Sequence, residues 1–121
     1  MLETKTVSEI INHLKSKDLS IKEVIEYYLN NIEKLNPKIN SIVSIKNKKE
    51  IIEEAEKKSN TKFCGLPIAV KDLSDVVGFP TTYGYPGTKN YNPKKNSLFV
   101  DKLLEAGITI IGKTNTAELG V

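Results

Sequence analysis

LPIAV at residues 66–70 and ITII at residues 108–111 are the two stretches that decide the fold of this chain. Each is a short, continuous apolar run, and such runs are typical of strands that are buried on both faces. Residues 97–105 lie between them and predict a helix, and Gly107 suits a left-handed helix end. The apolar face of this helix is formed by Leu98, Val100, Leu103 and Leu104. A strand, a helix and a second strand joined by short links predict an α/β fold with a mostly parallel sheet.

Two further helices are predicted in the first forty residues. Thr6 with Glu9, and Ser20 with Glu23, have the spacing of a capping box, in which a hydroxyl and a carboxylate satisfy the free amides at a helix start. Apolar residues recur at helical spacing after each cap. The dipeptide at 36–37, Asn-Pro, is expected to end the second helix, because the residue before a proline disfavours the helical conformation.

The chain is divided in two by this pattern. The β-branched run at residues 41–45 predicts a short strand, and the charged segment 48–58 predicts a third helix. We therefore expect a helical leader with a short strand over residues 1–60 and the start of an α/β core over residues 61–121. Two strands cannot cover themselves, so the core is expected to be incomplete and to need further chain or a partner.

The charge of the chain argues against nucleic-acid binding. Its formal net charge is only +3, and all 18 basic residues are lysines, many of which alternate with glutamates at helical spacing. This pattern is typical of solvated helix faces. A nucleic-acid surface would cluster its positive charge and use arginine for bidentate phosphate contacts.

The cysteine count and the apolar runs of the sequence indicate where in the cell the protein is expected. Cys64 is the only cysteine, so the chain predicts neither an internal disulfide nor a cysteine metal cluster, and a reducing cytoplasm is the expected location. No run approaches the roughly 18 apolar residues of a membrane span. We expect no metal and no organic cofactor, because the sequence has no ligand cluster at metal-binding spacing.

Lys71 is the main candidate for chemistry. It directly follows an apolar strand, and burial there would disfavour the charged ammonium and allow the amine to act as a general base near neutral pH. The alternative is structural: Lys71 would pair with Asp72 or another carboxylate at the end of the strand. Position alone leaves both interpretations open.

Three blocks of sequence resemble the amidase-signature family. GLPIAVKD at 65–72 is similar to the G-[IL]-P-[IVF]-x-[IVL]-K-D segment that carries the catalytic lysine of that family. GFPTTYG at 78–84 resembles its glycine and threonine loop, and LLEAG at 103–107 with GKTN at 112–115 and Glu118 resembles its L-x-x-A-G to G-K-T-N-x-x-E block. The helical first forty residues are similar to the family's leader, so the resemblance spans nearly the whole chain.

The resemblance implies an α/β hydrolase of carboxamide C–N bonds. Such enzymes use a serine nucleophile, a bridging serine in a cis peptide, and a lysine that matches Lys71. The two serines lie further along the family's chain, and none of the candidates here falls in their glycine- and serine-rich context (Ser41, Ser44, Ser59, Ser74, Ser97). We therefore expect this piece to be inactive alone and the full-length protein to act on a small-molecule amide. A homodimer, or association with the remaining C-terminal part, is the expected assembly.

Two alternatives remain beside a general amidase. The first is the A subunit of the tRNA-dependent amidotransferases, which would imply partner subunits and ammonia transfer to a charged tRNA. The segment from Lys71 to Val76, followed by TTYG at 81–84, is more similar to general amidases. The second is a non-catalytic interaction fragment or relic with exposed apolar strand surface.

Two positions depart from the family pattern. Asn96 stands where aspartate is usual, and we expect it to cap the helix that follows; Leu119 stands where phenylalanine is usual.

A phosphate-binding loop is the main competing motif. Residues 107–114 fit G-x-x-x-x-G-K-[ST], but a helix is predicted before Gly107 and a strand within the motif, which is the wrong context for that loop. Among other reactive residues, His13 and Cys64 are expected to be structural. The tyrosines of the loop could line a substrate cleft or serve as packing anchors (Tyr83, Tyr85, Tyr91).

Overall fold

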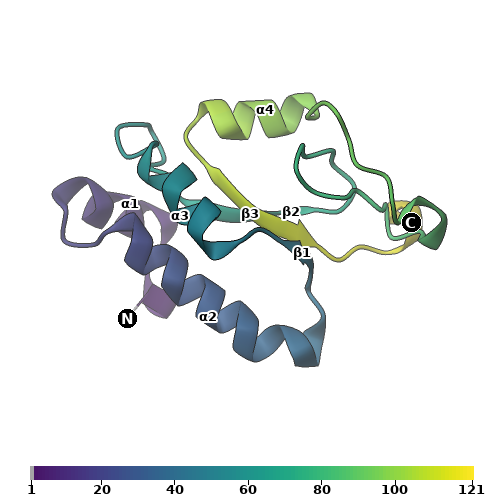
Figure 1. Ribbon diagram of the computed structural model, residues 1–121. Coiled ribbons are helices and arrows are strands. Elements are labelled where there is room, and N and C mark those ends of the chain that lie inside the picture. The colour runs from purple at the N-terminus through teal and green to yellow at the C-terminus, as the bar shows by residue number, and fades with distance from the viewer. Residues whose placement is uncertain (1) are drawn as a thin grey trace.

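A computed structural model describes residues 2–121 (Figure 1). The elements run in the order α1 (Val7–Ser16), α2 (Ile21–Ile39), β1 (Ile42–Ile45), α3 (Lys48–Glu56), β2 (Pro67–Lys71), α4 (Leu98–Glu105) and β3 (Thr109–Thr114). Short 3-10 turns stand at Leu2–Thr4, Pro86–Thr88 and Glu118–Gly120. Every helix and strand predicted from the sequence is therefore present, with boundaries that differ by a few residues.

Both capping boxes are formed. The Glu9 amide donates to the Thr6 hydroxyl at 3.3 Å, while the Thr6 amide donates to the Glu9 carboxylate at 2.6 Å. Ser20 and Glu23 repeat the arrangement at 3.2 and 2.8 Å. The backbone hydrogen bonds to Thr6 and Ser20 also lower the pKa of Glu9 and Glu23, respectively.

The expected end of α2 at Asn36-Pro37 is wrong. The helix continues to Ile39 and ends at Asn40, a left-handed residue whose amide donates to the Asn36 carbonyl at 2.8 Å. Tertiary contacts oppose the local preference of the proline. The Asn36 side chain donates to the Ile42 carbonyl at 2.9 Å and accepts from the Ile42 amide at 2.8 Å, which fixes the helix end against β1.

The sheet has the strand order β1-β3-β2. β2 and β3 are parallel and α4 crosses between them, as the sequence predicts, whereas β1 pairs with β3 in the antiparallel sense. β3 is buried over residues 109–113, but β2 is only partly buried before Val70. The prediction of strands buried on both faces is therefore correct for β3 alone, because β3 is the central strand.

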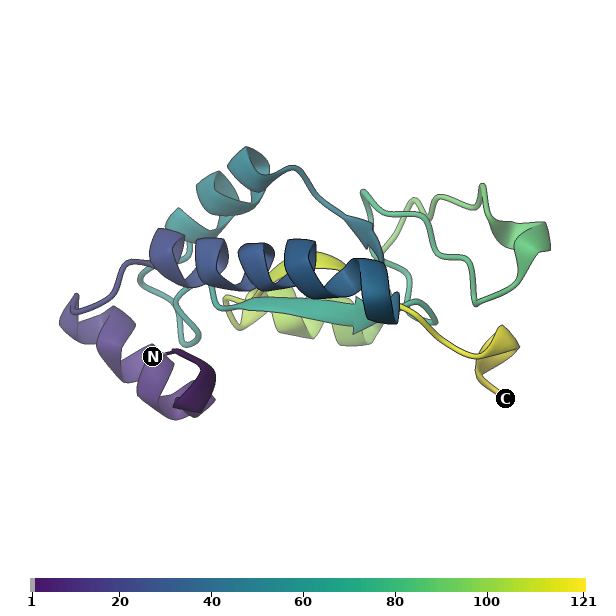
Figure 2. The same ribbon diagram turned by 90° about the horizontal axis from the view of Figure 1, so that it is seen from below.

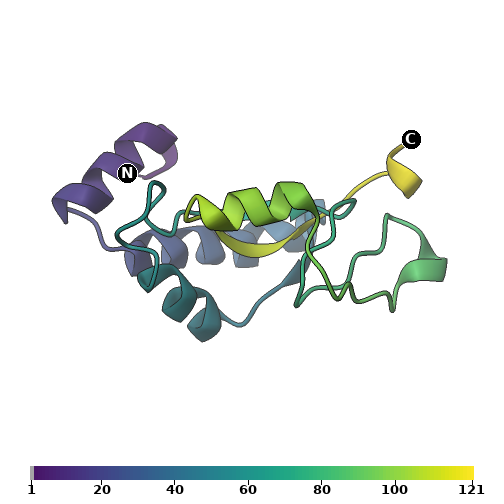
Figure 3. The same ribbon diagram turned by 90° about the horizontal axis from the view of Figure 1, so that it is seen from above.

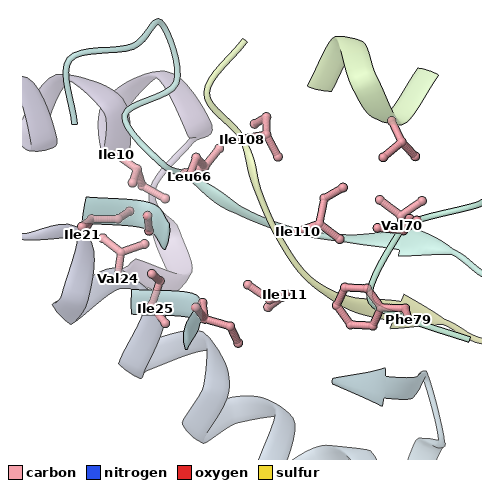
Figure 4. Packing of buried hydrophobic residues seen from close by; sticks show 14 of the residues in the cluster. Ile10, Ile21, Val24, Ile25, Leu66, Val70, Phe79, Ile108, Ile110 and Ile111 are labelled. Carbon is pink, nitrogen blue, oxygen red and sulfur yellow. The ribbon is translucent and has the colours of Figure 1, made fainter. Parts of the chain in front are cut away.

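The core lies on both faces of this small sheet. α4 covers one face and α2 and α3 cover the other, as the three views show (Figures 1, 2 and 3). Ile25 and Ile111 pack on the α2 side, and Val70 and Ile110 lie toward α4 (Figure 4). This packing holds the two parallel strands in place. Whether the chain divides at residue 60 stays a prediction.

Two glycines are required by the backbone. Gly107 has a φ of +92° directly after α4, in the left-handed conformation expected for a helix end. Gly112 lies where β3 approaches β1, and a Cβ atom there would stand 2.5 Å from the Ser44 carbonyl oxygen. The second glycine is therefore needed for close approach of two strands.

Within residues 2–121, none of the helices combines the length and the apolarity that crossing a membrane requires.

Replacing Ser20 with alanine should lower the free energy of unfolding by about 1 kcal/mol, because the cap of α2 is lost. Chemical denaturation compared with the unaltered protein measures the change. Ser8→Ala, at an exposed position of α1, is the matched control and should change little. Equal effects of the two variants would contradict a capping role.

Gly112→Ala should destabilise the protein by roughly 1–3 kcal/mol, because the added methyl meets backbone and not a flexible side chain. Thermal unfolding measures the effect. The same measurement on the unaltered protein tests the phosphate-binding-loop hypothesis, which predicts that an added nucleotide raises the melting temperature. An unchanged melting temperature in the variant would contradict the close contact between β1 and β3.

Candidate functional site

The carboxyl ends of β2 and β3 meet at one edge of the sheet. Lys71 is the last residue of β2 and lies beside Thr114 of β3. The loop after β2 and the segment after β3 extend from the same end (Figures 2 and 3). In parallel α/β sheets this edge is where ligands bind. Neighbouring residues of a strand face opposite sides, so Lys71 faces away from Val70 and Asp72.

Lys71 is exposed, and residues 2–121 offer its ammonium no hydrogen-bond or ion-pair partner. The expectation that this part of the sheet buries the side chain is therefore wrong, because β2 is an edge strand here. The structural alternative, a pair with Asp72, is also wrong. Asp72 turns to the opposite face and binds another lysine.

The other lysine is Lys113, in the middle of the sheet. Its side chain is 0% exposed and that of Asp72 is 2% exposed, and the two charges are 2.9 Å apart. Lys113 also donates to the Thr81 hydroxyl at 2.9 Å and makes a longer contact of 3.5 Å with the Pro80 carbonyl. In the sequence this lysine stands out only as a member of two motifs. The strand predicted from the sequence ends at Ile111, whereas β3 continues to Thr114, and this extension places Lys113 on the same face as Val70, its neighbour in register.

The same geometry excludes the phosphate-binding loop, as the sequence context predicts. Gly107 ends α4, and the residues that would cradle phosphate belong to β3, where their backbone groups pair with neighbouring strands. Lys113, the lysine of the pattern, is engaged by Asp72.

The other oxygen of the Asp72 carboxylate fixes the loop that follows. It accepts from the Thr82 amide at 3.1 Å and from the Thr82 hydroxyl. The Asp72 carbonyl accepts from the Tyr83 amide at 3.0 Å, and the Tyr83 carbonyl accepts from the Leu119 amide at 2.7 Å. The segments after β2 and β3 are therefore joined beside Lys71.

Asp75 organises two of the tyrosines. The hydroxyl of Tyr83 donates to one carboxylate oxygen at 3.0 Å and that of Tyr91 to the other at 3.1 Å, while the two rings stack at 6.3 Å. Burial, followed by the hydrogen bond to Asp75, raises the pKa of Tyr83, and the hydrogen bond is the main cause that raises the pKa of Tyr91. Tyr83 and Tyr91 are therefore held in place by Asp75, although Tyr91, like Tyr85, is exposed.

The loop between β2 and α4 is closed by hydrogen bonds between its first and last residues. The Ser97 amide donates to the Asp75 carbonyl at 3.0 Å, and the Val77 amide donates to the Asn96 side chain at 2.7 Å. Ser97, not Asn96, caps α4, so the expectation that Asn96 is the cap is wrong. The Asn96 side chain instead links the start of the loop to Asp101, because its amide group donates to the Asp101 carboxylate at 3.0 Å.

The remaining candidates lie at the other end of the sheet. His13 in α1 is 3.5 Å from the Asp18 carboxylate, and the buried Cys64 thiol contacts the Thr61 carbonyl at 3.5 Å. A hollow of about 580 Å³ beside Cys64 is lined from the turn after α1 and from residues 59–61, so it is remote from Lys71. Residues 2–121 contain no cluster of three His, Cys, Asp or Glu side chains placed for a metal ion.

A family model and curated relatives match most of this chain. The family model described as Amidase matches residues 23–121. The chain belongs to the amidase family. It is 32% identical to the A subunit of the glutamyl-tRNA(Gln) amidotransferase of Thermoanaerobacter pseudethanolicus, over 99% of this chain and 26% of that protein.

Solved amidase-signature structures share the fold. A bacterial aryl acylamidase of the amidase-signature enzymes has a TM-score of 0.83 at 26% identity, over 95% of this chain and 26% of that chain. The A subunit of the Thermotoga maritima glutamyl-tRNA(Gln) amidotransferase has a TM-score of 0.72 at 23% identity, over 95% and 24% of the two chains. The chain thus spans about a quarter of the length of the curated relatives it matches.

Asp75→Asn should lower the pH at which two of the five tyrosines ionise. A carboxylate that accepts from both hydroxyls disfavours a second negative charge, so removing its charge lowers the pKa of Tyr83 and Tyr91. Ultraviolet absorbance of tyrosinate during an alkaline titration measures the shift. Asp18→Asn, in the turn after α1, is the control, and an identical titration of both variants would contradict the role of Asp75.

Proposed function

We propose that this chain forms part of an enzyme that hydrolyses carboxamide C–N bonds, with Lys71 as its general base. The observation that carries the proposal is the position of Lys71 at the carboxyl end of β2. There it follows a family motif, is exposed to the edge where ligands bind, and has no counter-ion within residues 2–121.

The proposed chemistry is acyl transfer to a serine. The amine of Lys71 accepts a proton through a bridging serine as the nucleophilic serine attacks the carboxamide carbon, and the proton then passes to the leaving nitrogen. The acyl-enzyme is hydrolysed by water in a second step. The family resemblance implies both serines, and Ser97, one of the serines of this chain, caps α4 instead.

A second candidate is the A subunit of a glutamyl-tRNA(Gln) amidotransferase. The observation that favours it is the identity of 32–36% with proteins of that name over nearly all of this chain. Two observations favour the general amidase. The aryl acylamidase structure has a TM-score of 0.83, against 0.72 for the A subunit of the amidotransferase, and the motif after Lys71 is more similar to general amidases. Turnover of a simple carboxamide by the protein alone supports the amidase; turnover only with partner subunits and glutamyl-tRNA(Gln) supports the amidotransferase.

The assembly and location follow from the same proposal. We expect this segment to associate with the remainder of the polypeptide or with a second copy, and the protein to reside in the cytoplasm. Support for the location comes from the single, buried thiol of Cys64. A third hypothesis, a non-catalytic interaction fragment, predicts that no carboxamide is hydrolysed under any of these conditions.

Lys71→Ala should reduce turnover by about 10²–10⁴-fold, since a general base contributes that much to a proton transfer. The first step is to sequence the DNA downstream of the Val121 codon and to express the complete reading frame. Hydrolysis of a panel of small carboxamides then compares the variant with the unaltered enzyme.

Lys34→Ala is the matched control for this experiment. Lys34 is exposed on α2, and its ammonium has no partner within residues 2–121, so its loss should leave turnover unchanged. Full activity of Lys71→Ala would sink the proposed function.

A further inference from the structure

Asp72, the residue after Lys71, has all its polar groups engaged. Its amide donates to the Thr114 carbonyl at 3.0 Å, and its carbonyl accepts from the Tyr83 amide at 3.0 Å. One carboxylate oxygen binds the Lys113 ammonium, and the other binds Thr82. A residue held by two residues of β3 and by two residues of its own loop has one available orientation.

Lys113 is equally constrained. Its three ammonium protons meet the Asp72 carboxylate, the Thr81 hydroxyl and, at the longer distance, the Pro80 carbonyl. The ammonium thus has a partner for each donor while its side chain has no exposed surface. It ties the loop after β2 to the centre of the sheet.

Stability alone does not account for such a pair. The cost of removing two charges from water offsets their attraction, and apolar residues of the same size often serve a fold as well or better. What a fully satisfied ionic network provides is a unique geometry. The geometry fixed here is that of the peptide link between Lys71 and Asp72.

We propose that Asp72 and Lys113 are positioning residues for catalysis by Lys71. This inference rests on the proposed function. The pair lies on the face opposite Lys71 and has no net charge, so it orients the strand end without pairing with the amine. Through Thr81 and Thr82 it also fixes the loop at residues 80–84 relative to Lys71.

The first test is the double variant Asp72→Asn, Lys113→Met in the full-length enzyme. It removes both charges together, so no uncompensated charge stays buried. We expect a melting temperature close to that of the unaltered enzyme, a KM within about threefold, and a kcat lower by about 10²-fold, as for a displaced catalytic group. A folded double variant with unaltered kcat would overturn the proposal.

A milder pair of variants keeps the test decisive if the double variant does not fold. Thr82→Val removes the hydroxyl bound to Asp72 at nearly constant volume, whereas Thr82→Ser retains it. We expect kcat to fall about tenfold in the valine variant at unchanged KM and to recover in the serine variant. Equal kcat in both, or a loss that tracks the unfolded fraction, would overturn positioning.

These outcomes are separate from a failure of the proposed function. Full activity of Lys71→Ala refutes the general base itself. An inactive Lys71→Ala together with unaltered kcat in the folded Asp72 and Lys113 double variant refutes only the positioning role.

Discussion

The ion pair between Lys113 and Asp72 is the point at which three separate parts of the chain meet. One charge comes from the end of β2, the other from β3, and the loop at residues 80–82 supplies the remaining hydrogen-bond partners. Either charge left alone would be buried without compensation, which costs several kcal/mol. The loop can therefore not leave the sheet without breaking contacts to both charges, and the end of β2 inherits this rigidity.

The layers around the sheet make the burial of this pair possible. α4 on one face and α2 with α3 on the other exclude water from β3, so that hydrogen bonds at its carboxyl end act in a low-dielectric surrounding. The parallel pairing of β2 and β3 then brings both strand ends to one edge. Residues at this edge can vary while the scaffold below stays unchanged.

Features set by local rules could be predicted from the sequence, and features set by distant contacts could not. The capping boxes, the crossover helix and the left-handed Gly107 depend on a few neighbouring residues, and all were predicted. The helix end at Asn36-Pro37 was predicted wrongly because side-chain bonds to β1 keep the helix intact. The sequence marks Lys113 only as a member of two motifs, because its partner Asp72 lies 41 residues away and no local pattern predicts such a pair. The role of Lys71 was suggested by motif resemblance, while its exposure follows from the place of β2 at the edge of the sheet.

The joined ends of the loop between Asp75 and Ser97 bear on how such a protein diversifies. Because the Asp75 carbonyl and the Ser97 amide are hydrogen-bonded, the chain that departs at Asp75 returns to nearly the same point at Ser97. Lengthening a loop of this kind is cheap, since each doubling costs only about 0.6 kcal/mol in closure entropy. Insertions and deletions in the exposed part of this segment, at residues 85–87, can therefore reshape the surface at this end of the sheet without moving β2 or α4.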